Sequence, residues 1–276
     1  MSGGTPLDPY ALKEFGAGGF VRNKDLGGKT LITPKLSTVG LLMLVCIGQS
    51  LGANTCSGDY TCANPTLVAN FNPYDAANYT AVDPLVGPTG DFGDFISPGV
   101  QKYSNQFIRV ADKIITAGFA QRVLIANVNV GGTSISSWAG ILKESLDQTL
   151  FRMQQAGYDP QTIPTAICQQ QGTADRTMIQ ATYQGHMETM MDYIRTTKGW
   201  TNPKWVVAKE TRNNTDVGTG QPAAVDALAA LHPTYFFVGP DTDTILSADR
   251  YDNVHLAAAG ADTNSTLWTT ALDAVF

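Results

Sequence analysis

The feature that most constrains the fold is an alternation of short apolar runs with longer segments in which apolar residues recur every three or four positions. The short runs predict buried strands, and the longer spacing predicts amphipathic helices. Strands alternating with helices are typical of a parallel sheet covered on both faces, so we expect a three-layer α/β/α fold of the flavodoxin-like kind. The five expected strands are residues 41–47, 122–130, 162–168, 205–208 and 235–238. The expected helices are residues 100–117, 141–155, 178–196 and 223–231.

Two segments do not follow this alternation. Residues 54–99 are rich in Asn, Asp, Pro, Gly and aromatic residues, and we interpret them as a long loop insertion after the first strand that borders a functional site. Residues 1–38 show no sustained period and are expected to form an N-terminal arm before a single domain at 39–276. The glycines expected to end helices are Gly118, Gly157 and Gly199.

The composition and charge argue against several classes of function. The chain has 276 residues with 18 Lys and Arg against 24 Asp and Glu, so it lacks the basic surface that nucleic-acid binding needs. The longest apolar run, residues 39–47, is about half the length of a membrane span. Residues 1–15 lack the basic start and apolar stretch of a secretory signal, so we expect a location in the cytoplasm or within a larger particle.

The four cysteines are too few for a disulfide framework and lack the paired C-x-x-C spacing of a zinc site. Cys46 and Cys168 lie in apolar runs and are expected to be buried thiols. Cys56 and Cys62 bracket a short polar loop. Their spacing leaves both a disulfide and two free thiols open, because it does not fix the Cβ geometry.

The residues that follow each expected strand are the first candidates for a site, because ligands of an open parallel sheet bind beyond the carboxyl ends of its strands. Reactive or permissive groups occur there in four segments: Gly48-Gln49-Ser50-Leu51-Gly52, Gly131 to Trp138, Gln169 to Asp175, and Asp252-Asn253-Val254-His255. Together they supply a nucleophile, a base, a carboxylate and donors for an oxyanion, which are the parts of acyl transfer. This chemistry requires neither a metal nor another cofactor.

One of the three histidines stands out as a candidate base. A serine hydroxyl is a weak nucleophile at neutral pH, and histidine is the side chain best suited to take its proton. His186 lies within an expected helix and His232 precedes a proline in an expected turn, so both are interpreted as surface or packing residues. His255 follows Asp252 by three positions, which places a carboxylate within short reach.

The four segments, in this order, resemble the sequence blocks of the SGNH (GDSL-like) hydrolase superfamily, and more closely those of its sialate O-acetylesterase and carbohydrate-esterase branch. Those blocks read Gly-Gln-Ser, Gly-Gly-Thr-x-Ile-x-x-Trp, Gln-Gly-Glu-x-Asp and Asp-x-x-His. The matching residues are Gly48-Gln49-Ser50, Gly131 to Trp138, Gln171-Gly172 with Asp175, and Asp252 with His255. The resemblance extends from about residue 40 to the end of the chain. The chain departs from the pattern at Leu51, where Asn is usual, at Thr173, where Glu is usual, and at Gln169, where Trp is common.

The resemblance implies a catalytic triad. Ser50 is the implied nucleophile, His255 the general base and then acid, and Asp252 the residue that holds the imidazole ring. On this interpretation the protein is a serine esterase that removes small acyl groups, O-acetyl groups above all, from a carbohydrate without a cofactor. The departures from the pattern leave this triad intact and bear on the substrate specificity.

The resemblance also implies roles for residues around the triad. The implied oxyanion hole combines the Ser50 backbone N–H, a backbone N–H of Gly131 or Gly132, and the Gln171 side-chain amide. Gln49 and Thr133 are the implied substrate-binding residues. Two further motif residues have structural interpretations: Trp138 as a core residue, and Asp175 as the cap of the helix expected near residue 178.

Two other interpretations stay open at this point. The Gly48-x-Ser50-x-Gly52 spacing also fits the nucleophile elbow of α/β-hydrolases, although that elbow follows several strands and Ser50 follows the first strong one. Alternatively, a catalytically silent fold would serve as a carbohydrate-binding or structural component of a larger assembly, such as a virus particle. Residues 1–38 would then dock the chain onto its assembly partner.

Overall fold

The structure is a computed structural model that describes residues 25–88 and 104–276. Its centre is a seven-stranded sheet with the strand order β3-β2-β4-β1-β5-β6-β7. Neighbouring strands run parallel except β2 and β3, which pair antiparallel at one edge. The strands are β1 (Leu41–Gly48), β2 (Val68–Asn72), β3 (Ala77–Thr80), β4 (Arg122–Asn127), β5 (Thr165–Gln170), β6 (Lys204–Lys209) and β7 (Phe236–Asp241).

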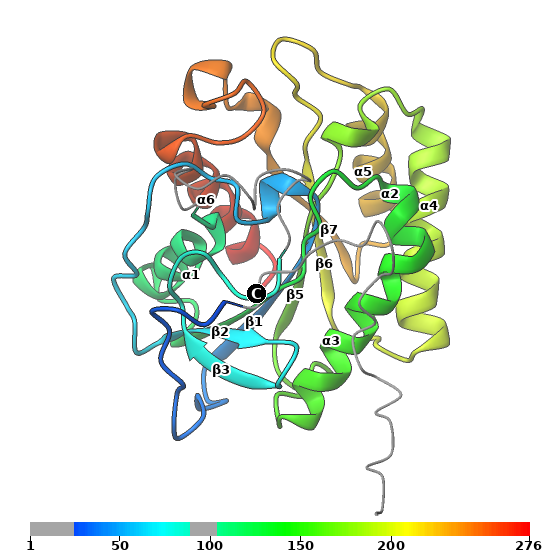
Figure 1. Ribbon diagram of the computed structural model, residues 1–276. Coiled ribbons are helices and arrows are strands. Elements are labelled where there is room, and N and C mark those ends of the chain that lie inside the picture. The colour runs from blue at the N-terminus through cyan, green and yellow to red at the C-terminus, as the bar shows by residue number, and fades with distance from the viewer. Residues whose placement is uncertain (1–24, 89–103) are drawn as a thin grey trace, which may run out of the picture.

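Helices cover both faces of the sheet, which confirms the predicted α/β/α class (Figure 1). On one face α1 and α6 contribute Phe107 and Trp268 to the core, and on the other face α3, α4 and α5 contribute Leu146, Met187 and Leu228. The helices are α1 (Gln106–Ala117), α2 (Ile135–Ser137), α3 (Lys143–Gln155), α4 (Gln180–Asp192), α5 (Gly220–Leu231) and α6 (Ala258–Asp273).

The central strand β1 is buried on both faces. Successive side chains of a strand point to opposite faces, so Met43 and Val45 join the core under α3 while Leu44 and Cys46 join the core under α1. All eight residues of β1 are buried. This two-sided burial explains why the strand has a continuous apolar sequence rather than an alternating one.

The interpretation of residues 54–99 as one long loop is wrong, because β2 and β3 lie within them and raise the strand count from about five to seven. β2 includes Asn70 and Asn72 among its five buried residues, and these polar side chains hide its apolar pattern. Asn70 is satisfied inside the protein, since its side-chain oxygen accepts the Val86 backbone N–H at 2.8 Å. Residues 89–99 lie outside the described residues.

The expected helices are present with shifted ends. The first one, predicted at 100–117, begins at Gln106, and residues 100–103 lie outside the described part of the chain. Gly118 ends this helix as predicted, with a φ of 82°. Gly157 and Gly199 also adopt positive φ values after helical segments. The pattern did not predict α6, whose Ala, Thr and Asn residues weaken the apolar spacing.

Part of the expected N-terminal arm packs against the domain. The Thr80 backbone N–H donates to the Thr30 carbonyl oxygen and the Ile32 N–H to that of Asn78, both at 2.9 Å. Leu36 lies in the core beside the sheet. Residues 1–24 lie outside the described residues, so the boundary at residue 38 stays a prediction.

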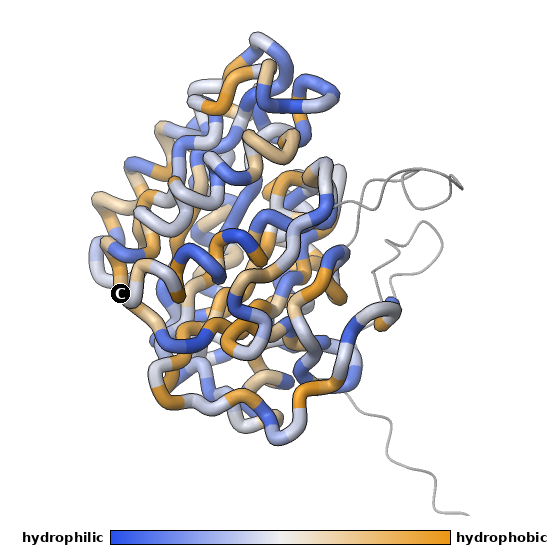
Figure 2. The backbone as a smooth tube through the Cα atoms, turned by 90° about the vertical axis from the view of Figure 1, so that its left-hand side faces the viewer, coloured by the Kyte–Doolittle hydropathy of each residue, from blue (hydrophilic) through white to orange (hydrophobic). Residues whose placement is uncertain are grey.

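The described residues show neither a disulfide nor a membrane-spanning helix. All four cysteines are buried free thiols, which confirms the prediction for Cys46 and Cys168 and decides between the two states of Cys56 and Cys62. Cys62 donates from Sγ to Asp112 Oδ1 at 3.3 Å. Hydrophobic and hydrophilic residues alternate along the chain (Figure 2), and no described helix is long and apolar enough to cross a bilayer.

The end of β1 requires a glycine, because Gly48 has a φ of 124° and a Cβ there would lie 2.0 Å from the Gln170 carbonyl oxygen. Gly118 also has a positive φ, but nothing lies within 4 Å of its Cβ position. Gly48→Ala is therefore expected to lower the free energy of unfolding by about 3 kcal/mol or more, against about 1 kcal/mol for Gly118→Ala. Urea denaturation measures both losses, and equal losses would contradict the described turn.

Candidate active site

Ser50 lies on a tight turn directly after β1. In this 3₁₀ turn the Gly52 N–H donates to the Gln49 carbonyl oxygen at 3.1 Å, and the Ala53 N–H donates to the Ser50 carbonyl oxygen at 2.8 Å. The Thr55 hydroxyl donates to the same Ser50 oxygen at 2.5 Å. These bonds fix the backbone of Ser50, which is 6% exposed.

Buried amide side chains brace this turn from behind. Gln106 of α1 donates to the Leu51 carbonyl oxygen at 2.7 Å and to Gln170 Oε1 at 2.5 Å. Asn264 of α6 donates to Gln106 Oε1 at 2.5 Å, and Trp268 donates to Gln170 Oε1 at 3.1 Å. Because breaking any of these bonds leaves a buried polar group unsatisfied, the network holds the turn firmly against α1, β5 and α6.

Asp252 and His255 lie on the loop before α6 and contact each other, as their spacing predicted. His255 Nδ1 lies 2.6 Å from Asp252 Oδ2, and the His255 backbone N–H donates to Asp252 Oδ1 at 2.7 Å. Partial burial raises the pKa of Asp252, but the hydrogen bonds from His255 outweigh it, so this pKa lies below its ordinary value. The carboxylate is therefore ionised at neutral pH and fixes the orientation of the imidazole ring. The Tyr251 ring stacks on the imidazole with 5.8 Å between centroids.

The turn of Ser50 and the loop of His255 pack against each other. Leu51 and Leu256, the residues that follow Ser50 and His255, are buried in one small apolar cluster. The Ser57 backbone N–H also donates to the Leu256 carbonyl oxygen at 3.0 Å. The candidate nucleophile and the candidate base are thus brought to the same region of the carboxyl edge of the sheet.

The glycine-rich segment after β4 is anchored at both ends. Thr133 is 3% exposed, and its hydroxyl donates to the Val130 carbonyl oxygen at 2.7 Å. Trp138 is a fully buried core residue, as interpreted, and donates from Nε1 to the Gly48 carbonyl oxygen at 3.2 Å. Two glycines directly precede Thr133. Gly131 is buried, and Gly132 is exposed with a φ of 71°.

Gln171 and Asp175 join the third segment to the second. The Gln171 side-chain nitrogen donates to the Thr133 carbonyl oxygen at 2.8 Å and to Asp175 Oδ2 at 2.6 Å. The Asp175 carboxylate also accepts the Ile135 N–H, with Oδ2 at 2.9 Å, at the start of α2. Burial raises the pKa of Asp175 despite these hydrogen bonds. The helix near residue 178 begins at Gln180, so the cap interpretation of Asp175 is wrong for that helix, and its carboxylate caps α2 instead.

The motifs missed one residue in this region, Glu210, which directly follows β6. Glu210 is fully buried, and its Oε1 accepts from Gln49 Nε2 at 2.5 Å and from the Thr173 hydroxyl at 3.0 Å. Burial raises its pKa to about 8, although both hydrogen bonds lower it. Gln49 is 2% exposed, and its Oε1 accepts the Ala174 backbone N–H at 3.1 Å. The signal that points to Glu210 is its place at a strand end, two residues beyond the predicted end of that strand.

The loop that begins at Glu210 bridges the other segments of the site. The Asn214 N–H donates to the carbonyl oxygen of Asn253, which lies between Asp252 and His255, at 3.0 Å. Asp216 pairs with Arg176, just after the third segment, at 3.0 Å. This loop therefore contacts both the histidine loop and the residue that follows the third segment.

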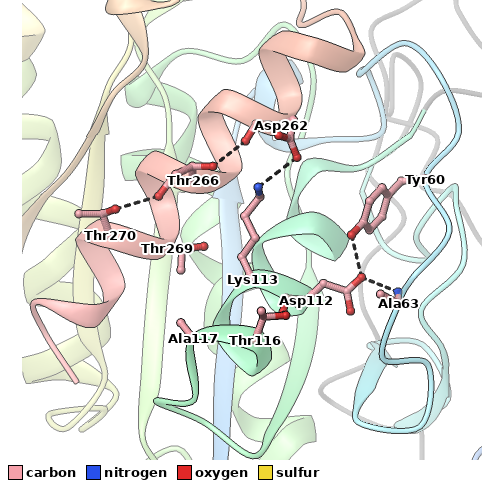
Figure 3. A pocket seen from close by; sticks show the side chains of 10 residues that line it. All are labelled: Tyr60, Ala63, Asp112, Lys113, Thr116, Ala117, Asp262, Thr266, Thr269 and Thr270. Atoms are coloured by element: carbon pink, nitrogen blue, oxygen red, sulfur yellow. Dashed lines mark hydrogen bonds and ion pairs between the residues drawn. The ribbon is translucent and has the colours of Figure 1, made fainter.

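A pocket of about 400 Å³ lies away from these residues, between α1 and α6 (Figure 3). Its polar groups bond within the protein: Tyr60 donates to Asp112 at 2.9 Å, Lys113 pairs with Asp262 at 3.1 Å, and Thr266 donates to the Asp262 carbonyl oxygen at 3.1 Å. No residue of the four segments lines this pocket, and we assign it no role. Among residues 25–88 and 104–276, no three His, Cys, Asp or Glu side chains gather as metal ligands would.

The raised pKa of Glu210 predicts a pH-dependent stability. A carboxyl that titrates at about 8 when folded and near 4.5 when unfolded holds more protons in the folded state between these values, so the free energy of unfolding falls as pH rises through them. Glu210→Gln removes this titration. The free energy of unfolding of the variant, relative to that of the wild type, should therefore rise by at least about 1 kcal/mol from about pH 5 to about pH 9. Urea denaturation at both pH values measures this difference in the free energy of unfolding, with the half-buried Glu188→Gln as control. A difference that is the same at both pH values would contradict a buried, titrating Glu210.

Comparisons with known proteins give matches in structure but not in sequence. No family model matches the chain, and neither does any curated protein sequence. A protein from Arabidopsis thaliana superposes with a TM-score of 0.63 at 15% identity, over 85% of this chain and 98% of its own. A family two carbohydrate esterase from Cellvibrio japonicus gives 0.51 at 14% identity, over 88% and 62%. A carbohydrate acetylesterase from Xanthomonas citri gives 0.52 at 10% identity, over 84% and 56%.

These likenesses bear on the fold, since the identities are low. In the three matches the shared part covers most of this chain, from 84% to 88%. The two carbohydrate esterases are longer, so the shared part is just over half of each. The resemblance that the four sequence segments predicted is therefore confirmed at the level of the fold: this chain shares the α/β/α fold of these carbohydrate esterases.

Proposed function

We propose that this protein is a serine esterase that removes small acyl groups, in particular O-acetyl groups, from a carbohydrate. The observation that carries the proposal is the Asp252–His255 pair, held at 2.6 Å on a loop that packs against the turn of Ser50. This arrangement supplies the base and the orienting carboxylate that a serine nucleophile needs. The carbohydrate esterases that share the fold support the choice of substrate class.

In the proposed mechanism His255 Nδ1 stays bonded to Asp252, so Nε2 is the ring nitrogen that moves protons. Nε2 takes the proton of Ser50 Oγ as this oxygen attacks the ester carbonyl carbon. The tetrahedral intermediate then collapses, the bond from the carbonyl carbon to the sugar oxygen breaks, and Nε2 gives its proton to that oxygen. A water molecule, deprotonated by Nε2, attacks the acyl-enzyme, and acetate leaves as Ser50 Oγ takes the proton back.

The proposed oxyanion hole uses the Ser50 N–H, an N–H of Gly131 or Gly132, and the Gln171 amide. In the described conformation both N–H groups of that amide are used, one by the Thr133 carbonyl oxygen and one by a carboxylate. Gln171 would therefore exchange its bond to Thr133 for a bond to the oxyanion. Such an exchange is favourable, because an ionised acceptor forms a stronger hydrogen bond than a neutral carbonyl.

Gln49 and Thr133 are proposed to contribute to substrate binding indirectly. Both side chains are buried, at 2% and 3% exposure, and both are hydrogen-bonded within the protein. A buried, bonded side chain shapes the wall of a site rather than contacting a sugar. The substrate contacts would then come from the backbone of their segments.

The other interpretations of the sequence have less support. Ser50 follows β1, the first strand of the described residues, whereas the nucleophile elbow of α/β-hydrolases follows several strands. A silent assembly component would leave the Asp252–His255 pair without a use. It remains an outcome of the following test rather than a second proposal.

The proposal is tested by the release of p-nitrophenol from p-nitrophenyl acetate and from a longer-chain ester. Ser50→Ala is expected to abolish turnover with the thermal unfolding unchanged, because the variant loses the attacking oxygen and little packing. The exposed Ser37→Ala is the matched control and should keep full activity. Release of acetate from acetylated sugars then tests the substrate class. Equal activity of Ser50→Ala and the wild type would refute the triad, and no turnover by either would favour the silent role.

The role of Gln171 is tested by its replacement with alanine. If its amide serves the oxyanion, Gln171→Ala lowers kcat by about a hundredfold or more with little change in KM, because the lost donor acts in the transition state. Gln169→Ala is the control: this glutamine lies in the same strand region but donates to Met187 Sδ at 3.1 Å. An effect of Gln171→Ala confined to KM would show that the amide only binds substrate.

A further inference from the structure

We propose that Glu210 is a positioning residue that acts through Gln49 to hold the nucleophile turn; this inference rests on the proposed function of Ser50. Glu210 follows β6 and Gln49 follows β1, and β5 lies between these two strands. The Glu210 side chain therefore reaches across the end of β5 to the residue that precedes Ser50. The backbones meet closely at this crossing, since a Cβ on Gly172 would lie 1.8 Å from the Glu210 carbonyl oxygen.

Three hydrogen bonds close a ring around the Gln49 amide, and the Gln171 side-chain nitrogen makes a fourth, longer bond to Gln49 Oε1 at 3.4 Å. Gln49 Nε2 donates to Glu210 Oε1 at 2.5 Å, and the Thr173 hydroxyl donates to the same oxygen at 3.0 Å. The backbone N–H of Ala174, the residue after Thr173, donates to Gln49 Oε1 at 3.1 Å. Gln49, Thr173 and Glu210 are all at most 8% exposed, so water does not compete for these bonds.

This ring controls the backbone that presents Ser50. The Gln49 backbone N–H donates to the Gln170 carbonyl oxygen at 2.9 Å, and the Gln49 carbonyl oxygen accepts the Gly52 N–H at 3.1 Å. With its side chain held at both the nitrogen and the oxygen, Gln49 has no freedom to turn without breaking a buried bond. The directions of the Ser50 N–H and Oγ depend on the peptide that joins the two residues, so the ring fixes the geometry of attack.

Glu210 has a different task from Asp252. Asp252 bonds the imidazole ring, whereas the described hydrogen bonds of the Glu210 carboxyl group lead to Gln49 and Thr173. The charged groups that act on Glu210 are Asp243 and Arg250, both on the segment after β7. Its second oxygen, Oε2, has no hydrogen-bond partner among the described residues. Glu210 therefore acts on Ser50 through Gln49 and is not a fourth member of the triad.

The position of Glu210 also accounts for a departure from the motif. The third segment has Thr173 where the resembled block has glutamate, and the hydroxyl of Thr173 donates to Glu210. A carboxyl group is thus present in this layer of the site, but it is supplied by the end of the neighbouring strand β6.

The test compares Glu210→Ala, Gln49→Ala, their double variant and Glu210→Gln in the full chain, with p-nitrophenyl acetate as substrate. Glu210→Ala should lower kcat about tenfold or more with KM within about twofold, because a misdirected nucleophile slows chemistry rather than binding. Glu210→Gln should stay within about threefold of the wild type, since its amide oxygen accepts the same two bonds. In the Gln49→Ala background, Glu210→Ala should lower kcat no further, because the two residues act as one unit. The control Glu188→Ala should leave kcat unchanged.

A second measurement does not depend on activity. Hydrogen–deuterium exchange of the peptide covering residues 47–53 should be at least about tenfold faster in Glu210→Ala and unchanged in Glu188→Ala. Glu210→Leu fills the same space without accepting a bond, and it replaces the alanine variant if that variant does not fold.

The outcomes separate this inference from the proposed function. Unchanged kcat and exchange in Glu210→Ala, or losses that add in the double variant, would overturn the role of Glu210 while leaving an esterase in place. A wild type without Ser50-dependent turnover would refute the proposed function. In that case the exchange result alone decides whether Glu210 holds the turn through Gln49.

Discussion

The placement of every candidate residue depends on the burial of β1 between helices on both faces of the sheet. β1 lies between β4 and β5, and the three strands run parallel, so all three end at the same edge of the sheet. Ser50 therefore emerges at the centre of that edge, with the glycine-rich segment on one side and the glutamine segment on the other. The steric limit at Gly48 fixes how the chain turns there, because the Gln170 carbonyl oxygen fills the space that a side chain would need. The site is thus a consequence of sheet topology before any hydrogen bond of its own is considered.

The same edge has a polar interior. Gln49, Gln106, Gln170, Gln171 and Glu210 are all buried there, at no more than 2% exposure. Burying amides and carboxyls costs free energy unless they are paired, and Glu210 Oε2 and Gln171 Oε1 have no hydrogen-bond partner among the described residues. The same burial raises the pKa of Glu210. Burial of these polar groups lowers the stability of the fold, while their hydrogen bonds fix the positions of the side chains. This combination is expected at a functional site.

The sequence predicted those features that depend on local patterns. The strands β1, β4, β5, β6 and β7 follow apolar runs, and the Asp252–His255 contact follows from a spacing of three residues on one loop. β2 was missed because Asn70 and Asn72 interrupt its apolar pattern, and the Asn70 amide bonds the Val86 N–H and the Ile125 carbonyl oxygen of the neighbouring strand β4. Glu210 was missed for a related reason. Its partner Gln49 lies 161 residues earlier, so no spacing within one segment could reveal the pair.

Leu51 illustrates the different roles of apolar packing and hydrogen bonding in the site. It stands where the resembled motif has Asn, and it is buried with Leu256 in one apolar cluster. Apolar packing is non-directional, so this contact sets the separation of the nucleophile turn and the histidine loop without setting their orientation. Orientation comes from hydrogen bonds: Asp252 directs the imidazole ring, and in the proposed scheme Glu210 directs the turn. The two kinds of contact therefore control different aspects of the geometry. Loss of the apolar contact would change the distance between the candidate nucleophile and base, and loss of the hydrogen bonds would change the angle between them.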